Sequence, residues 1–209
     1  MTAVPEREIA PTRIALLELL DERRLVREGY ELLDERRMLL AARILRGLQD
    51  LERQRSELAA HWDRLLQRLR EALGAHGLND LEAWPPATLN VVLTRRVESV
   101  LGVEITSAAI QTEVGSAAWP AVSSSSAIQA CIDTVPPLLT VAASLAALES
   151  SLLRLAEEYL RTERRTRAIE NVLLPELETD LRNVEAALEG LDQEEVVRVH
   201  SLRTSGWGQ

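Results

Sequence analysis

The feature that most constrains this chain is a stretch of 73 residues between Pro11 and Pro85 that contains no proline. Only four glycines interrupt the helix-forming residues there, and the hydroxyl of Thr12 can cap the first free N–H groups. We therefore expect one helix from Thr12 to Leu73, roughly 90 Å long at 1.5 Å per residue. Such a helix needs another element to cover its apolar side along most of that length.

Apolar residues recur along this helix with the spacing of a coiled coil. Alternating steps of three and four select eleven positions, of which eight are apolar, against 46% in the whole chain. These positions are Leu16, Leu19, Arg23, Val26, Tyr30, Leu33, Arg37, Leu40, Ile44, Gly47 and Leu51. Two of them are arginines, and two interpretations stay open. Either Arg23 and Arg37 reach outward to a carboxylate of a second arm (Glu170, Glu176 or Glu178), or the surface around them docks against further subunits.

A second helical arm is predicted over residues 138–200. The same spacing recurs in Leu145, Leu148, Leu152, Leu155 and Tyr159, and again in Leu177, Leu181, Val184, Leu188 and Leu191. Pro175 lies between these two sets, and an interior proline kinks or splits a helix because it removes a hydrogen bond and clashes with the preceding turn. Two such arms cover each other's apolar sides as an antiparallel pair. If they pair about a midpoint near residue 105, Arg36 and Arg37 lie opposite Pro175 and Glu176.

The residues between the arms, 74–137, have a different composition. Thr88–Thr94 and Val97–Ile105 are rich in β-branched residues, which predicts a small hairpin with Arg95 and Arg96 near its turn. At a period of two, Val97, Leu101, Val103 and Ile105 are expected on one face. The predicted fold is mainly α: a long antiparallel two-helix coiled coil (arms 12–73 and 138–200) with a small β-hairpin-containing tip in the middle of the chain, and tails at 1–11 and 201–209.

Composition argues against several classes of function. The chain has 33 acidic residues and 24 basic ones, all Arg, for a net charge of −9, which disfavours a general nucleic-acid binder. Its one cysteine, Cys131, leaves no internal disulfide and is interpreted as a buried or idle thiol. The three histidines lack a metal-ligand spacing, and no glycine-rich phosphate loop is present, so we expect no catalytic residue, cofactor or metal.

No membrane insertion is expected either. The longest apolar stretch, 114–148, is broken by Pro120, Asp133, Pro136 and Pro137, and residues 1–11 do not show the pattern of a signal peptide.

Two motifs in the arms resemble a known family. Ala10-Pro11-Thr12-Arg13, followed by Gly29-Tyr30-Glu31-Leu32-Leu33 and Arg36-Arg37, is similar to the start of the D subunit of V-type and archaeal-type ATPases. The run from Glu163-Arg164-Arg165 through Glu170 to Pro175 resembles that family's second motif. The sequence differs from the family pattern at Asp34, Met38 and Arg167.

The resemblance implies a non-catalytic rotor subunit. It would transmit torque between ATP synthesis or hydrolysis in a catalytic hexamer and proton or sodium transport through a membrane ring, at the cytoplasmic face of the membrane. It also implies that Pro11, Thr12, Arg13, Arg36, Arg37, Arg164, Arg165, Glu170 and Pro175 face the nucleotide-binding subunits of the hexamer. The β element would then bind a small stalk subunit or a ring adaptor through Val97, Leu101, Val103 and Ile105. The alternative is a free-standing coiled-coil scaffold or chaperone that binds partner helices.

Overall fold

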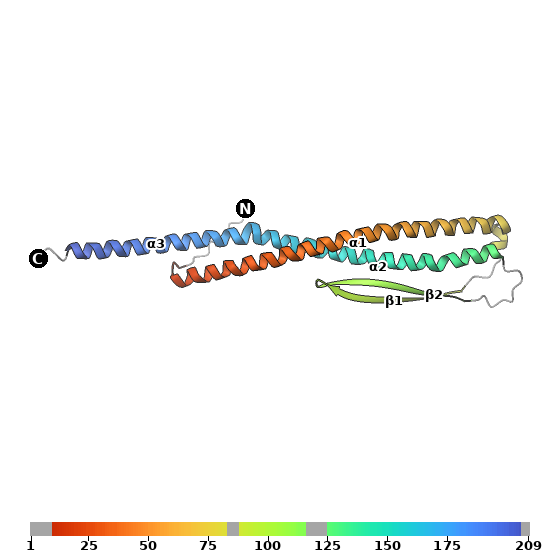
Figure 1. Ribbon diagram of the computed structural model, residues 1–209, viewed down its shortest axis with the longest axis horizontal. Coiled ribbons are helices and arrows are strands. Elements are labelled where there is room, and N and C mark those ends of the chain that lie inside the picture. Colours follow the sequence, from red (N-terminus) through yellow and green to blue (C-terminus); the bar gives the residue numbers. More distant parts are fainter. Residues whose placement is uncertain (1–9, 83–87, 116–124, 206–209) are drawn as a thin grey trace. The chain divides into compact units, whose positions relative to one another are not determined.

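The computed structural model describes residues 10–82, 88–115 and 125–205. Along the chain they form α1 (Arg13–Glu82), β1 (Thr88–Val100), β2 (Val103–Gly115), α2 (Ser126–Ala168), the π-helix η1 (Ile169–Leu173) and α3 (Leu174–Ser205) (Figure 1). The predicted fold class, a helix hairpin with a two-stranded antiparallel sheet in the middle of the chain, is confirmed. The chain divides into unit 1 (Met1–Met38 with Leu160–Gln209) and unit 2 (Leu39–Tyr159).

Unit 1 is built on the pairing of the start of α1 with α3. Leu19 is buried against Leu177, Leu181 and Val184, and the half-buried residues around this cluster are Leu16, Leu20, Val26 and Leu188. Most of these residues belong to the apolar spacing recognised in the sequence. The predicted N-cap is also confirmed, because the Ala15 N–H donates to Thr12 Oγ1 at 3.1 Å.

The segment of unit 1 before α3 has a polar interior. Thr162 and Thr166 are buried, and the Thr166 hydroxyl donates to the Thr162 carbonyl at 3.0 Å. In η1, which follows, the Leu174 N–H bonds the Ile169 carbonyl five residues back. Pro175 lies two residues after η1 and has no N–H to give the regular α-helical bond, so a local departure from α geometry is favoured here.

Unit 2 contains the rest of α1, the start of α2 and the sheet. Leu40, Leu152, Leu155 and Val103 form its main buried cluster, with Ile44, Leu51, Ile105, Leu148 and Tyr159 half-buried around it. The two helices approach closely at Gly47, where an added Cβ would overlap Leu152 Cδ2 and lie 3.3 Å from Leu152 Cγ. The strand β2 therefore contributes to the same core as the helices.

The hairpin differs from its prediction in two ways. Its turn is Leu101–Gly102, whose φ angles of 54° and 78° are the two positive values of a type I′ turn, and Arg95 and Arg96 lie inside β1. Val97 pairs with Thr106, and Val100 pairs with Val103. Because a two-residue turn shifts the alternation, Val97 lies on the face opposite to Val103 and Ile105, and the prediction of one shared face was wrong.

The helices extend further into the predicted insert than expected. The first helix continues to Glu82, with a break at Gly77 (φ 75°, ψ 168°), and α2 begins at Ser126 and runs through Pro136 and Pro137. The serine run 123–126 has the composition of a flexible linker, but it is described only from residue 125 onward, and its last residue begins α2. Figure 1 shows the hairpin running alongside α2 in unit 2, so it is not a separate tip.

One helical stretch within Ser126–Ser201 is long and apolar enough to cross a membrane, judged by length and composition alone. Pro136 and Pro137 do not break α2, contrary to the sequence argument. In the structure the middle of α2 contacts α1 through Ser144 and Gln54, and β2 through Ser151 and Thr106. These contacts cover only part of the apolar stretch, because only 17% of it is buried.

Candidate partner interfaces

The two residues before α1 and its first residue lie at the surface of unit 1. Pro11, Thr12 and Arg13 are exposed, and Arg13 Nη2 lies 3.7 Å from the carboxylate of Asp192 on α3. Both members of this ion pair are mostly exposed, so it adds little stability. The exposed charges at this end are therefore accessible to a partner.

The arginines at the seam do not bridge the arms as one interpretation required. Arg37 Nη2 lies 2.6 Å from Asp34 Oδ1 in the same helix. This carboxylate oxygen is buried and accepts no aligned hydrogen bond from the described residues, so the contact is an ion pair. Both side chains are about one-third exposed. Arg37 thus has an internal electrostatic role in addition to any role at the surface.

The register of the arms differs from the expected one. Arg27 Nη2, not Arg23 or Arg37, reaches Glu178 Oε1 on α3, at 3.4 Å. Since this pairing places residue 178 at the level of residue 27, Pro175 and Glu176 lie near the level of residues 28–30, well before Arg36. The prediction that Arg36 and Arg37 face Pro175 was wrong because it assumed that the arms pair about residue 105.

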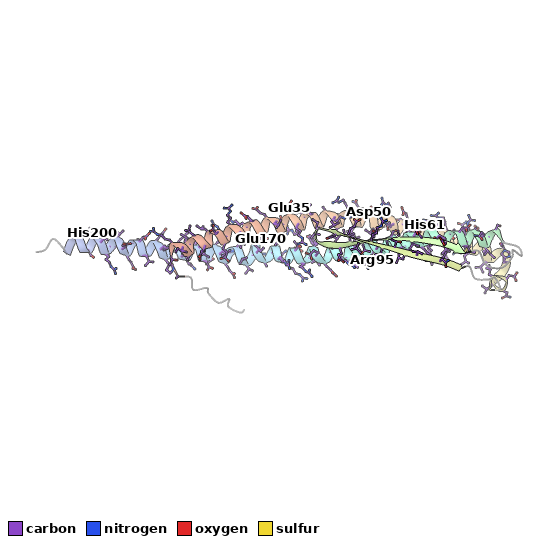
Figure 2. The ribbon with its side chains drawn as sticks, turned by 90° about the horizontal axis from the view of Figure 1, so that it is seen from below. Glu35, Asp50, His61, Arg95, Glu170 and His200 are labelled. Carbon is purple, nitrogen blue, oxygen red and sulfur yellow. The ribbon has the colours of Figure 1, made fainter. Side chains whose placement is uncertain are left out.

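The motif at the end of α2 presents its charges outward. Arg164, Arg165, Glu170 and Pro175 are all exposed. Glu170 lies on the arm opposite to the one that carries Glu35 (Figure 2). These residues are brought to the surface of unit 1 but do not gather at one point.

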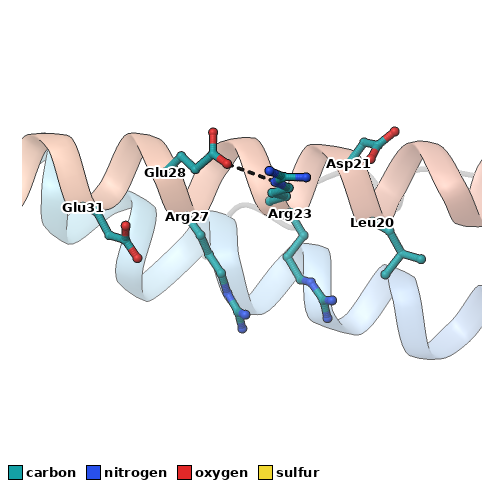
Figure 3. Close-up of a pocket in the computed structure, with 7 residues that line it drawn as sticks. Leu20, Asp21, Arg23, Arg27, Glu28 and Glu31 are labelled. Atoms are coloured by element: carbon teal, nitrogen blue, oxygen red, sulfur yellow. Dashed lines mark hydrogen bonds and ion pairs between the residues drawn. The ribbon is translucent and has the colours of Figure 1, made fainter.

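Arg23 lines a shallow groove of about 490 Å³ on α1. The guanidinium groups of Arg23 and Arg27 extend in the same direction from this groove (Figure 3), and Arg24 bonds Glu28 at 3.0 Å. The other lining residues are Leu20, Asp21 and Glu31. Arg23 makes no ion pair with any residue that the structure describes, so its charge is free to meet an acidic partner.

A second apolar stripe lies on α1, outside the coiled-coil spacing. It consists of Ile14, Leu17, Leu25 and Leu32, whose exposed fractions are 70%, 62%, 69% and 67%. The three leucines follow Ile14 by three, eleven and eighteen residues, and they share one side of the helix because eleven and eighteen residues are close to whole turns. We name this set the outer stripe. The signal was present in the sequence, but the coiled-coil pattern accounted for only one apolar side.

The end of α3 is also uncovered. Figure 1 shows α3 continuing past the start of α1, and every residue from 189 to 201 is exposed. Leu191, Val196, Val197 and Val199 are among them, each about half exposed or more. This last part of α3 therefore exposes apolar side chains that no described residue of unit 1 covers.

In unit 2, the hairpin is fastened to α2 by one buried side chain. The hydroxyl of Ser151 accepts a hydrogen bond from the Thr106 N–H at 2.9 Å and lies 3.0 Å from the Thr106 carbonyl oxygen. It also lies 2.8 Å from the Ala147 carbonyl, the usual acceptor within its own helix. Arg154 Nη1 adds an exposed contact to Glu104, 3.8 Å from its carboxylate. The outer edge of β2 therefore rests on α2.

The four apolar residues predicted for the ring-side interface divide into two groups. Val103 is buried and Ile105 half-buried in the core of unit 2, whereas Val97 is 49% and Leu101 37% exposed. Only the latter two are accessible, and the exposed surface extends along β1. Val91, Val92 and Leu93 are 46%, 59% and 60% exposed.

The described residues offer little reactive chemistry. Burial raises the pKa of the Cys131 thiol, which lowers its thiolate fraction at neutral pH. No group of three or more metal-ligating side chains is found within residues 10–82, 88–115 and 125–205.

Comparisons with known proteins agree with this picture. Residues 15–204 match the family model described as the D subunit of ATP synthase. The chain is similar to the D subunit of the V-type ATP synthase of Thermotoga neapolitana, with 25% identity covering 93% of this chain and 97% of the relative. It is 31% identical to the D subunit of the V-type ATP synthase of Anaeromyxobacter dehalogenans, covering 93% and 95% of the two chains. The D subunit of the A-type ATP synthase of Pyrococcus horikoshii is 25% identical, with 94% of each chain covered.

Proposed function

The chain belongs to the family of ATP synthase D subunits, and on this premise we propose that it is the central rotor of a V/A-type ATP synthase. In this role it transmits torque between the nucleotide-binding hexamer and the ion-transporting membrane ring, without an active site of its own. It works at the cytoplasmic face of the membrane, as a peripheral part of the complex. The observation that carries the proposal is the outer stripe of unit 1.

The outer stripe supports a hexamer-facing role for unit 1. The seam of α1 already packs against α3, so a second row of exposed leucines contributes nothing to the fold of this chain. Exposed apolar rows of this kind mark protein interfaces. The exposed motif residues Arg13, Arg164, Arg165 and Glu170 add charges that acidic and basic loops of surrounding subunits can meet in turn. Guanidinium groups suit sliding contacts because they stay charged and form forked bonds.

The hairpin supports a second interface in unit 2. A small stalk subunit or a ring adaptor would contact Val97, Leu101 and the exposed part of β1, while Val103 and Ile105 hold the hairpin in place. Removing residues 86–120 is expected to leave association with the hexamer intact and to uncouple ATP hydrolysis from ion transport. Loss of hexamer association in that deletion would contradict the proposal.

The outer stripe gives the sharpest test. The variant Leu25→Ser with Leu32→Ser removes about two-thirds-exposed side chains, so the thermal midpoint of the isolated chain should change little. ATP turnover or torque of the reconstituted complex should fall several-fold, because about 25 cal/mol per Å² of apolar contact is lost at the interface. As a matched control, Leu19→Ser alters a buried leucine of the same helix and should lower the midpoint strongly.

Copurification distinguishes the rotor from a free-standing scaffold. A rotor copurifies with nucleotide-binding subunits in one copy per three catalytic sites, whereas a free-standing scaffold self-associates symmetrically. Normal turnover in the outer-stripe variant, or symmetric self-association without nucleotide-binding subunits, would refute the rotor assignment.

A further inference from the structure

The contact between Ser151 and Thr106 shows which N–H and carbonyl groups of β1 point away from β2. Both the N–H and the carbonyl of Thr106 point out of the sheet edge toward Ser151, so the pair Val97–Thr106 is not hydrogen-bonded within the hairpin. Hydrogen-bonded and non-bonded pairs alternate along an antiparallel ladder. The outward groups of β1 therefore belong to the odd-numbered residues, which are Leu89, Val91, Leu93, Arg95, Val97 and Ser99.

This outer edge of β1 is long, regular and uncovered. The ladder contains 13 consecutive pairs, with no residue skipped by the register. Residues 91–99 are all exposed, and β1 contains neither a proline nor a bulge that would interrupt its free edge. The outer edge of β2 contacts α2 at Thr106 and Glu104, whereas the outer edge of β1 is a template for a further strand.

Charge indicates which kind of strand fits. Arg95 donates only a long hydrogen bond of 3.4 Å to Thr106 Oγ1, and Arg96 makes no ion pair with a residue that the structure describes. These are the only basic residues of the hairpin, in a chain with a net charge of −9. Arg95 and Arg96 outnumber the single acidic residue of β1, Glu98, so two paired copies of β1 would carry four guanidinium groups against two carboxylates, which is less favourable than pairing with an acidic strand. The edge thus disfavours a second copy and favours an acidic partner.

We propose that the outer edge of β1, from Leu89 to Val97, receives an extended segment of a neighbouring subunit as a third strand. The added strand has apolar side chains beside Val91, Leu93 and Val97, and an aspartate or glutamate beside Arg95. Backbone hydrogen bonds provide the affinity, and the alternating side chains select the partner. The inference rests on the proposed rotor function, and it specifies how the hairpin is bound.

Amide hydrogen exchange tests this and does not require the partner to be identified. In the isolated full-length chain, the outward amides of Val91, Leu93 and Val97 should exchange rapidly, while those of the inward residues Val92 and Thr94 are protected. In the assembled ATP synthase the outward amides should slow by at least about 100-fold, since strand pairing buries their hydrogen bonds. Outward amides that exchange equally fast in the complex would overturn the proposal.

A proline variant probes the same edge by function. Leu93→Pro removes one outward N–H, which an edge strand tolerates, and should weaken binding of the neighbouring subunit at least about tenfold. Leu93→Thr keeps the N–H and should retain more of the binding. Equal binding by Leu93→Pro and the unchanged chain would overturn the proposal. So would outward amides that become protected in the isolated chain as its concentration rises, because that result identifies a second copy as the occupant.

The two proposals fail in distinguishable ways. A chain that does not copurify with nucleotide-binding subunits contradicts the rotor function itself. A chain that copurifies and supports turnover, but whose β1 amides stay unprotected, contradicts only the added strand.

Discussion

Because α1 and α2 approach closely at Gly47, the effect of Gly47→Ala on stability depends on one neighbour, Leu152. Replacing a glycine inside a helix by alanine gains about 1 kcal/mol of helix propensity. At Gly29, in the same helix, an added Cβ has nothing within 4 Å, so Gly29→Ala should stabilise the chain by up to that amount. At Gly47, the new methyl would overlap Leu152 Cδ2.

The cost at Gly47 follows from how little Leu152 can move. Its side chain is only 8% exposed and packs in the core of unit 2. Turning Cδ2 away does not relieve the crowding, because Leu152 Cγ lies only 3.3 Å from the added Cβ. Overpacking of this kind costs about 1–3 kcal/mol. After subtracting the propensity gain, Gly47→Ala should be neutral to destabilising by about 2 kcal/mol.

A double-mutant cycle isolates this contact. Leu152→Ala alone should destabilise the chain by about 2–5 kcal/mol through the cavity it leaves. In that background the methyl at residue 47 has room, so Gly47→Ala should become stabilising, with a coupling energy of about 1–3 kcal/mol. Urea unfolding of the full-length chain, followed by circular dichroism, gives all four free energies of unfolding. If Gly47→Ala stabilises the unchanged chain as much as Gly29→Ala does, the reasoning is refuted.

Three further predictions concern single side chains. Ser151→Ala leaves the Thr106 N–H without its acceptor and should lower the free energy of unfolding, measured by urea titration, by about 1–3 kcal/mol. Ser56→Ala is the control: this exposed serine bonds only its own helix, so its loss should have little effect. Arg37→Ala leaves the buried oxygen of Asp34 without its cation and should lower the free energy of unfolding by about 1 kcal/mol. Adding Asp34→Ala should restore part of that stability, and strictly additive effects in the double variant would contradict the pairing. Because burial raises the pKa of Cys131, its alkylation rate should reach half-maximum at a higher pH than that of a free thiol, and a midpoint at or below that of the free thiol would disprove burial.

Much of the helical architecture could be predicted because it depends on local information. The proline-free stretch and the spacing of Leu19, Leu40, Leu155 and Leu181 indicate paired helices, and the same residues form the buried clusters. The Thr12 cap involves only the first turn of α1, so it too could be predicted from the sequence. Family membership was recognisable from motifs in both arms, since each motif lies within a single helical arm of the sequence.

The hairpin shows where pattern reasoning stopped. The alternation of β-branched residues indicates strands but does not say where they turn, and moving the turn to Leu101–Gly102 transferred Val97 to the other face. Pro136 and Pro137 suggested a helix boundary, yet α2 runs through them while contacting both α1 and β2. Contacts distant in sequence decided both outcomes.

The sequence by itself determined that two long helices exist and which side of each is apolar, because helix formation and periodicity arise from residues a few positions apart. Only the tertiary structure decided the register of the arms, through contacts such as Arg27 with Glu178. It also decided where the hairpin packs on α2, through the contact of Ser151 with Thr106. It also showed which apolar residues remain uncovered. Burial depends on what lies opposite a residue in space, and a side chain such as Leu25 or Leu93 has the same local pattern whether its partner belongs to this chain or to another.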